Sequence, residues 1–271
     1  MKLCVLGSGS GGNAVLMQSG TTRILIDAGF PPRTLVRRLA SIGVDPRSIE
    51  AVVITHEHID HVRGAAGGAR RFGWRIYATS GTQSGCASIR KVGAETIAPD
   101  THFQIGDIRL DVIGISHDAN EPVAFVATGQ STGVRAGVVY DLGVVTRSVQ
   151  EALDRVDILV LESNHDGDML RNGPYPAMLK RRIAGHAGHL SNRAAGTAAA
   201  ECAHRGMSHV VLAHLSETNN TPQTANEAMR LALKKTPFKG CIVIADQNHP
   251  STTISADRAA AFGHPQLTLG I

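Results

Sequence analysis

Aromatic residues are scarce in this chain of 271 residues, which has six Phe, three Tyr and one Trp. So few aromatic side chains argue against a surface on which successive single-stranded bases stack. No apolar run reaches the roughly 18 residues of a membrane-spanning helix. The N-terminal MKLCVLGSGSGG is typical of a first strand and its turn, not of a signal peptide. The sequence therefore predicts a cytoplasmic protein without membrane contact.

Cysteine is also rare, with four widely separated residues and no C-x-x-C pair. A cysteine zinc site or redox pair is therefore not expected, and Cys4, Cys86, Cys202 and Cys241 are interpreted as small buried thiols. Hydrophobic residues make 42% and charged residues 18%, as in ordinary globular enzymes. Without a linker or a low-complexity stretch, we expect one domain over residues 1–271. The net charge of +4 is compatible with an anionic partner.

Short apolar segments alternate with amphipathic ones along the chain. In the first half they predict strands at 2–6, 14–18, 23–26, 51–55, 75–78, 108–116, 123–128 and 135–140, with helices at 33–42, 61–72 and 84–92. In the second half they predict strands at 158–162, 210–213 and 241–245, with helices at 176–183, 191–203 and 221–234. Two sheet-rich halves with helices outside predict an α+β sandwich of two sheets covered by helices.

Histidine, by contrast, is abundant, with thirteen residues that are unevenly spread. The densest group is THEHIDH at 55–61, directly after a predicted buried strand. In an extended segment, His56 and His58 point the same way and can hold one ion. If a helix begins near Asp60, then Asp60 and His61 turn toward a neighbouring position. Imidazole and carboxylate suit Zn²⁺, Mn²⁺ or Fe²⁺, so the segment predicts a metal site in preference to an accidentally histidine-rich loop.

The H-x-H-x-D-H motif resembles the metallo-β-lactamase superfamily, and the resemblance extends along nearly the whole chain. ISHDA, YDLG and LAHLS occur in the superfamily's order, each at the end of a predicted strand. The resemblance implies an αββα sandwich with two divalent ions. It also implies their ligands: His56, His58 and His117 for one ion, Asp60, His61 and His214 for the other, and Asp141 between them.

The charge of such a site favours an anionic substrate. Two divalent ions carry +4, two aspartates remove two charges and a bridging hydroxide removes one, which leaves +1. This charge attracts a phosphodiester and stabilises the additional charge of its transition state. The metals lower the pKa of a bridging water toward ~7, which makes hydroxide available as the nucleophile. Two ions about 3.5–4 Å apart can also hold the attacking and transferring oxygens together.

Longer sequence motifs indicate which branch of the superfamily the chain resembles. LGSGSGGNA, LVLESNHD, GHLSN and LAHLSETNNTP together are similar to the bacterial YycJ/WalJ group, whose members are regarded as 5′→3′ exonucleases on DNA. GHLSN ahead of LAHLS is also similar to ribonuclease Z. The resemblance therefore implies a dinuclear metal-dependent phosphodiesterase, foremost a 5′→3′ DNA exonuclease. The implied partner is a nucleic acid substrate.

A histidine near its reference pKa of ~6.5 can protonate the leaving oxygen of a phosphodiester. His189 in GHLSN is the candidate, with Glu162 and Asn164 as groups that orient it. The alternatives are that His189 only packs beside the helix predicted from 191, and that His186 is the acid. The residues predicted to act in catalysis are Asp60, His189 and Glu162.

Substrate contacts are predicted in two segments. In RNGPYP, Arg171 can hold a phosphate and Tyr175 can stack on a base or sugar. The glycine run at 7–13 lacks the helix that follows a dinucleotide-binding loop, so it predicts a tight hairpin near the metals. In that hairpin, Ser8 and Asn13 are candidates for contact with the site or the substrate, and the alternative is a purely structural turn. Basic groups including Lys180, Arg181 and Arg182 are either ordinary solvated faces or part of a DNA track.

Two other functions remain open. The same activated water can attack a carbonyl, so a hydrolase of a β-lactam, lactone or thioester is one alternative. Against it, no cysteine follows a strand where many true β-lactamases hold their second metal, and the GHLSN histidine would have no obvious role. An RNA-processing nuclease is the other alternative. The sequence indicates no oligomeric state.

Overall fold

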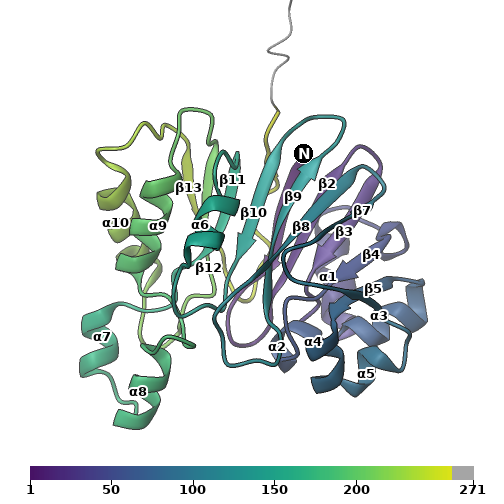
Figure 1. Cartoon of the computed structure of the whole chain (residues 1–271), viewed down its shortest axis with the longest axis horizontal. Helices are drawn as coiled ribbons and strands as arrows, with labels where there is room; N and C mark the ends of the chain where they lie inside the picture. Colours follow the sequence, from purple (N-terminus) through teal and green to yellow (C-terminus); the bar gives the residue numbers. More distant parts are fainter. Residues whose placement is uncertain (258–271) are drawn as a thin grey trace, which may run out of the picture.

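The computed structural model describes residues 1–257 as two seven-stranded sheets packed face to face, with helices on their outer faces (Figure 1). The predicted α+β sandwich is therefore confirmed. The predicted domain also includes residues 258–271, which lie outside the described residues. Within residues 1–257, no helix is both long and apolar enough to cross a membrane.

The first sheet begins as antiparallel hairpins and continues with parallel strands. Its outer face is covered by α1 (Pro32–Ser41), α3 (Ala65–Phe72), α4 (Ser80–Gly85) and α5 (Ala87–Arg90) (Figure 1). In spatial order its strands are β14 (Ile254–Ser255), β1 (Lys2–Gly7), β2 (Ala14–Ser19), β3 (Thr22–Ile26), β4 (Ala51–Val53), β5 (Arg75–Thr79) and β6 (Glu95–Ile97).

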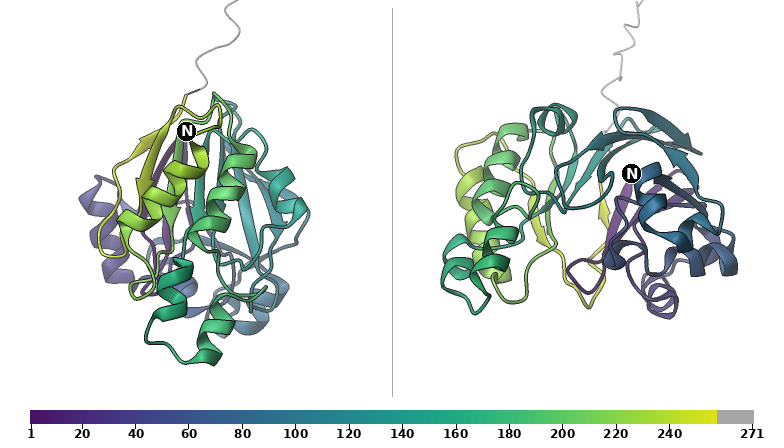
Figure 2. Two further views of the ribbon diagram at one scale, coloured as in Figure 1. Left: turned by 90° about the vertical axis from the view of Figure 1, so that its left-hand side faces the viewer. Right: turned by 60° about the horizontal axis from the view of Figure 1, so that its bottom comes forward.

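The second sheet has the same plan, with an antiparallel half and a parallel half. Its outer face carries α6 (Arg147–Ala152), α9 (Asn192–Cys202) and α10 (Pro222–Leu233), of which α9 and α10 lie side by side (Figure 2). In spatial order its strands are β13 (Cys241–Ile244), β12 (His209–Ala213), β11 (Ile158–Glu162), β10 (Arg135–Val139), β9 (Val123–Gly129), β8 (Ile108–Gly114) and β7 (His102–Ile105).

The strands are apolar on both faces because each sheet packs against the other sheet and against helices. Val5 and Ile26 point into the layer between the sheets, where they meet residues such as Phe125. Leu25 faces the other way and packs against α1. Since successive strand residues alternate between faces, the continuous apolar runs in the sequence require both faces to be covered. This burial fixes the strand ends, from which the polar site is built.

Two predicted helices are each divided in the structure. The segment 61–72 forms α2 (Ile59–Val62) and α3 (Ala65–Phe72), separated at Gly64. The Gly64 N–H donates to Ala28 O at 2.7 Å, and a Cβ on Gly64 would lie 2.4 Å from Phe30 O. The chain therefore leaves the helix to pack against the turn after β3. The segment 84–92 begins earlier, as α4, because Thr79 caps the Thr82 N–H, and it continues as α5.

Some short elements were not predicted: β6, β7, α6, α7 (Gly167–Asn172) and β14. Their few residues carry too little periodicity to distinguish them from loops. The helix predicted at 176–183 is α8 (Ala177–Ile183), which projects with α7 from the lower end of the sandwich (Figure 1).

The cysteine prediction is correct in part. All four cysteines are free, and Cys4 and Cys202 are buried. Cys86 is half-buried and Cys241 is exposed, so the prediction of a buried thiol is wrong for Cys241. Cys241 is the first residue of β13, an edge strand of the second sheet.

Candidate metal centre

Three polar residues lie just beyond strands that end at the same edge of the sandwich. Asp27 follows β3, Asp141 comes two residues after β10, and His214 follows β12. Their φ angles are 59°, 56° and 53°, in the left-handed region that residues other than glycine seldom adopt. Such strained backbone persists only where the surrounding structure imposes it, and it gathers at functional sites. Here it turns three polar side chains over the sheet ends.

The first group of ligand-type side chains contains the two histidines of the extended segment after β4. His58 Nδ1 lies 3.3 Å from His117 Nε2, and the ring of His56 lies 4.5 Å from the ring of His58 and 4.9 Å from that of His117. One nitrogen from each of the three rings lies within 4.8 Å of the others. The structure thus brings together the three histidines that the resemblance implies for one ion.

The second group lies beside the first. His61 Nε2 is 3.4 Å from Asp60 Oδ2, and His214 Nε2 is 3.8 Å from the same oxygen. Asp141 Oδ2 is 3.0 Å from His61 Nε2, and Asp141 also forms a compact group with His56 and His61. Asp141 therefore lies between the two groups, where a bridging carboxylate is expected.

The outer nitrogens of three histidines are held by oxygen acceptors. His61 Nδ1 lies 2.7 Å from Asp27 Oδ2, and His214 Nδ1 lies 2.9 Å from Glu162 Oε1. His117 Nδ1 lies 3.3 Å from Gly188 O. These contacts fix each ring and leave its Nε2 for the centre of the cluster, as is usual for histidines that bind metal.

The residues present fit divalent metal ions. His56 Nε2 and His214 Nε2 are buried, and within residues 1–257 neither has a hydrogen-bond partner. A buried polar atom without a partner is costly, and a metal ion would satisfy both nitrogens. Imidazole and carboxylate together are the donor set of Zn²⁺, Mn²⁺ and Fe²⁺ sites.

The electrostatics of the cluster favour added positive charge. Burial opposes ionisation of Glu162, but the charge of His189 and hydrogen bonds from His189 and His214 lower its pKa to about 2. Burial also opposes the charged form of His214, but Asp141, Asp60 and Glu162 raise its pKa to about 10. The carboxylates thus attract protons onto nearby histidines. Divalent cations would supply this positive charge and displace those protons.

His189 and Glu162 lie at the same centre. His189 Nδ1 is 2.8 Å from Glu162 Oε1, and the His189 ring lies 5.3 Å from the His117 ring and 5.2 Å from that of His214. Glu162 is fully buried and accepts backbone N–H groups of Leu142 and Leu190 on its other oxygen. One oxygen of Glu162 therefore orients His189 and His214, while backbone N–H groups hold the other oxygen in place.

A family described as "Beta-lactamase superfamily domain" matches residues 22–215. The exodeoxyribonuclease WalJ of Streptococcus pneumoniae is 31% identical over 236 residues, which are 84% of this chain and 86% of WalJ. The exodeoxyribonuclease YycJ of Bacillus anthracis is 30% identical over 242 residues, 86% of this chain and 89% of YycJ. The chain belongs to the metallo-β-lactamase superfamily. It is therefore a metal-dependent hydrolase.

The fold of a solved structure agrees with this membership of the metallo-β-lactamase superfamily. The metallo-β-lactamase fold protein YhfI from Bacillus subtilis has a TM-score of 0.70 against this chain, covering 92% of it and 98% of YhfI. The two sequences are 20% identical, so this likeness concerns the fold alone.

The glycine-rich hairpin between β1 and β2 contacts the centre. Asn13 Nδ2 lies 3.1 Å from His61 Nε2, and the Asn13 N–H donates to Asp60 O at 2.8 Å. Ser8 Oγ accepts the His214 N–H at 2.9 Å. Both side chains are buried and bond to the site's own residues, which makes them supports of the cluster. A direct contact of either one with substrate stays a prediction.

The other predicted residues differ in whether they contact the cluster. Tyr175 shares a hollow with His189 and His214, and its hydroxyl donates to Thr218 Oγ1 at 3.1 Å. Asn164 Nδ2 donates to His214 O, so it orients the backbone of His214 and not the ring of His189. Arg171 is exposed on α7, where it pairs with Asp168. His186 is exposed and bonds to Ser116 through its ring and its carbonyl.

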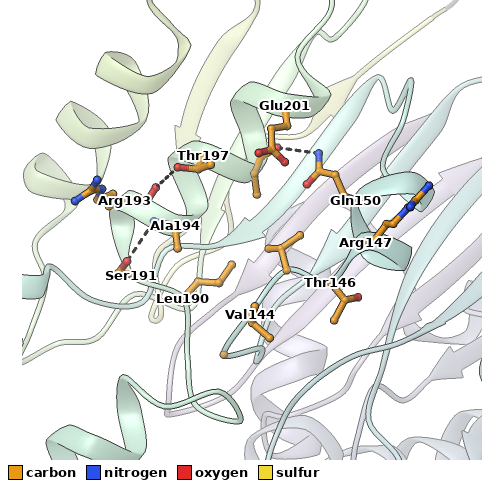
Figure 3. A pocket seen from close by; sticks show the side chains of 13 residues that line it. Val144, Thr146, Arg147, Gln150, Leu190, Ser191, Arg193, Ala194, Thr197 and Glu201 are labelled. Carbon is orange, nitrogen blue, oxygen red and sulfur yellow. Dashed lines mark hydrogen bonds between the residues drawn. The ribbon is translucent and has the colours of Figure 1, made fainter.

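A large hollow of about 630 Å³ lies between α6 and α9 (Figure 3). Its walls include Val144, Leu190 and the stems of Arg147 and Arg193, and none of the predicted metal ligands lines it. In Figure 3 the Gln150 side chain reaches across it toward α9, where it donates to Ala198 O at 3.3 Å. The candidate chemistry therefore lies in the smaller hollows around His189.

Asp27 is a site residue that the sequence analysis missed. Its carboxylate is fully buried and accepts the Thr55 N–H and hydroxyl and the Tyr140 hydroxyl, each at 2.8 Å, besides meeting His61. Asp27 stands in the sequence IDAG at 26–29, and a single aspartate after a strand is usually a turn residue. Only the positions of Tyr140 and His61 in the fold show its role.

We expect Asp27→Asn to weaken metal binding by roughly 10- to 100-fold, the usual effect of losing a partner that orients a ligand. The substitution removes the negative charge beside His61 Nδ1 while keeping the size of the side chain. Competition with a chromogenic chelator measures the affinity. Asp107→Asn is the matched control, because Asp107 also accepts hydroxyl bonds, from Ser19 and Ser131, at the opposite strand ends. Equal affinity in the two variants would contradict the assignment.

Removing metal with a chelator is expected to lower the Tm by roughly 8 °C or more. Ions at about 1,000 times their Kd stabilise a folded protein by about 4 kcal/mol, and each kcal/mol changes the Tm of a chain of this size by about 2–4 °C. Differential scanning calorimetry before and after chelation, with metal added back as the control, measures the change. An unchanged Tm would show that bound metal does not stabilise the folded protein.

Proposed function

We propose that this protein is a dinuclear metal-dependent exonuclease that degrades DNA from its 5′ end. The observation that carries the proposal is the pair of adjacent ligand groups with His189 beside them. The sequence similarity to two proteins named exodeoxyribonucleases over more than four fifths of the chain supports DNA as substrate.

The two ligand groups are proposed to hold one ion each. Asp141 lies within reach of both groups and is proposed to bridge the ions. When bound, two divalent cations lower the pKa of water and neutralise charge on a phosphodiester. The proposed ligands are His56, His58 and His117 for the first ion, and Asp60, His61 and His214 for the second.

His189 is proposed to supply the proton that the leaving oxygen needs. Its Nδ1 is occupied by Glu162, so Nε2 is the nitrogen left for a substrate. The buried carboxylate fixes the ring and stabilises its imidazolium form, from which Nε2 donates. Glu162 acts here as a positioning residue, because its oxygens contact His189, His214 and backbone N–H groups.

The hollow beside His189 and His214 is proposed to take the sugar and base of one nucleotide next to the scissile phosphate. Its volume is about 190 Å³. Tyr175 forms one wall and can stack on a base or sugar. Hydroxyls of Ser10, Ser216 and Thr218 and the amide of Asn164 line the same hollow and provide hydrogen-bond partners.

Digestion of duplex DNA labelled at either end tests the proposal. With Mn²⁺ or Zn²⁺, DNA labelled at the 5′ end is expected to release label in mononucleotides from the first turnover, and 3′-labelled DNA is expected to shorten stepwise. With chelator, neither substrate is expected to change. Stepwise shortening of the 5′-labelled strand would overturn the polarity. Cleavage of RNA but not DNA would overturn the substrate and favour an RNA-processing nuclease.

A further inference from the structure

A second, smaller hollow also borders His189. Its volume is about 140 Å³, and its walls include Asp118, Arg182 and Gly188. Ile183 and His189 line this hollow and also the hollow that contains Tyr175. The two hollows therefore adjoin each other at His189, and a polynucleotide bound there can contact both of them.

Arg182 reaches this hollow from α8 and is held there by Asp118. Its Nε donates to Asp118 Oδ2 at 2.8 Å, and its Nη2 bonds to the same oxygen. The other oxygen of Asp118 lies 3.3 Å from His117 Nε2, one of the proposed ligand atoms. Asp118 thus lies between the Arg182 guanidinium and a proposed ligand of the metal centre.

Asp118 does not engage all N–H donors of the Arg182 guanidinium. Arginine carries five N–H groups, and Asp118 engages only Nε and Nη2. Among the described residues, Nη1 has no hydrogen-bond partner, and the Arg182 side chain is 66% exposed. The free Nη1 edge is therefore open to an incoming phosphate, which arginine binds through two parallel N–H donors.

Neighbouring basic residues are placed differently. Arg171 pairs with Asp168, and Lys180 Nζ donates to Arg171 O at 2.8 Å. Arg181 is exposed on α8 but lines neither of the hollows beside His189. Among these four basic residues of α7 and α8, Arg182 is the one that the structure fixes at the centre.

We propose that Arg182 binds the backbone phosphate next to the scissile one, in the hollow on the Asp118 side of His189. The inference rests on the proposed nuclease function and deepens it by naming a second phosphate site. A substrate with a single phosphate does not reach this site, whereas a polynucleotide does.

Kinetics of three variants test the proposal on DNA and on bis(p-nitrophenyl) phosphate, which has one phosphate. Arg182→Ala is expected to raise KM for DNA roughly 10-fold, as for loss of a charged hydrogen bond, with kcat little changed. Arg182→Lys is expected to raise KM less, because it keeps the charge but loses the fork. Arg181→Ala is the matched control, since it removes the same charge from the next residue. It is expected to change KM less than about twofold.

Hydrolysis of the aryl diester is expected to be unchanged in all three variants. Equal KM values for DNA in Arg181→Ala and Arg182→Ala would overturn the inference and leave the nuclease function standing. A matching loss on the aryl diester in Arg182→Ala would also overturn it, because Arg182 would then act on the metal centre itself. If the wild-type protein cleaves the aryl diester but no polynucleotide, the proposed function and the inference both fail.

Discussion

His58→Ala is expected to remove metal and activity together. His58 Nδ1 points at His117 Nε2 in the first ligand group, and the side chain is half-buried, so its loss leaves the core intact. We expect fewer than two ions per chain and a loss of DNA cleavage of at least about 1,000-fold. That loss would exceed the 10- to 100-fold typical of a residue that only supports a ligand.

Metal content measured by inductively coupled plasma mass spectrometry, beside DNA cleavage rates, checks this expectation. His102→Ala is the matched control, because His102 is an exposed histidine at the start of β7 and belongs to neither ligand group. The control is expected to keep the wild-type metal content and rate. Wild-type metal content in His58→Ala would contradict the proposed ligand set.

His189→Ala is expected to keep the metals and lose rate only where the leaving group needs a proton. A general acid contributes typically about 10²- to 10⁴-fold, so DNA cleavage should fall by that factor. An aryl phosphodiester has a leaving group that departs without a proton, and its hydrolysis should be largely retained. The structure supports this split, because the His189 ring is braced by Glu162 and lies beside both proposed ion groups.

Two further variants separate the general acid from its neighbours. His186→Ala removes the alternative acid, an exposed residue bonded to Ser116, and is expected to leave DNA cleavage within about threefold of wild type. Glu162→Gln removes the negative charge beside His189 and His214. It is expected to slow the hydrolysis of both DNA and the aryl diester. Equal losses on DNA and the aryl diester in His189→Ala would contradict the general-acid role.

The proposed metal ligands share a position in the sequence that could be recognised. His56, His117, Asp141 and His214 each follow an apolar strand, and ends of neighbouring strands meet at one edge of a sheet. The segment THEHIDH contains the remaining proposed ligands. For His117, Asp141 and His214, the resemblance to the metallo-β-lactamase superfamily was needed to select them, and the structure brings them together with the histidines of THEHIDH.

Other features depend on contacts between distant segments. The break between α2 and α3 occurs because Gly64 packs against the turn after β3, which the periodicity of 61–72 does not reveal. The role of Asp27 depends on Tyr140, more than a hundred residues away in sequence. Arg181 and Arg182 are equivalent in the sequence, and only the contact with Asp118 distinguishes Arg182.

The most direct test of the dinuclear nuclease is a metal titration of the metal-free protein coupled to DNA cleavage. Protein stripped by chelator receives zero to three equivalents of Mn²⁺ or Zn²⁺, and the release of 5′-labelled nucleotide is measured at each step. The proposed centre predicts no cleavage without metal and a rate that reaches its plateau only when two ions are bound per chain. A plateau at one equivalent, or cleavage by the metal-free protein, would contradict it.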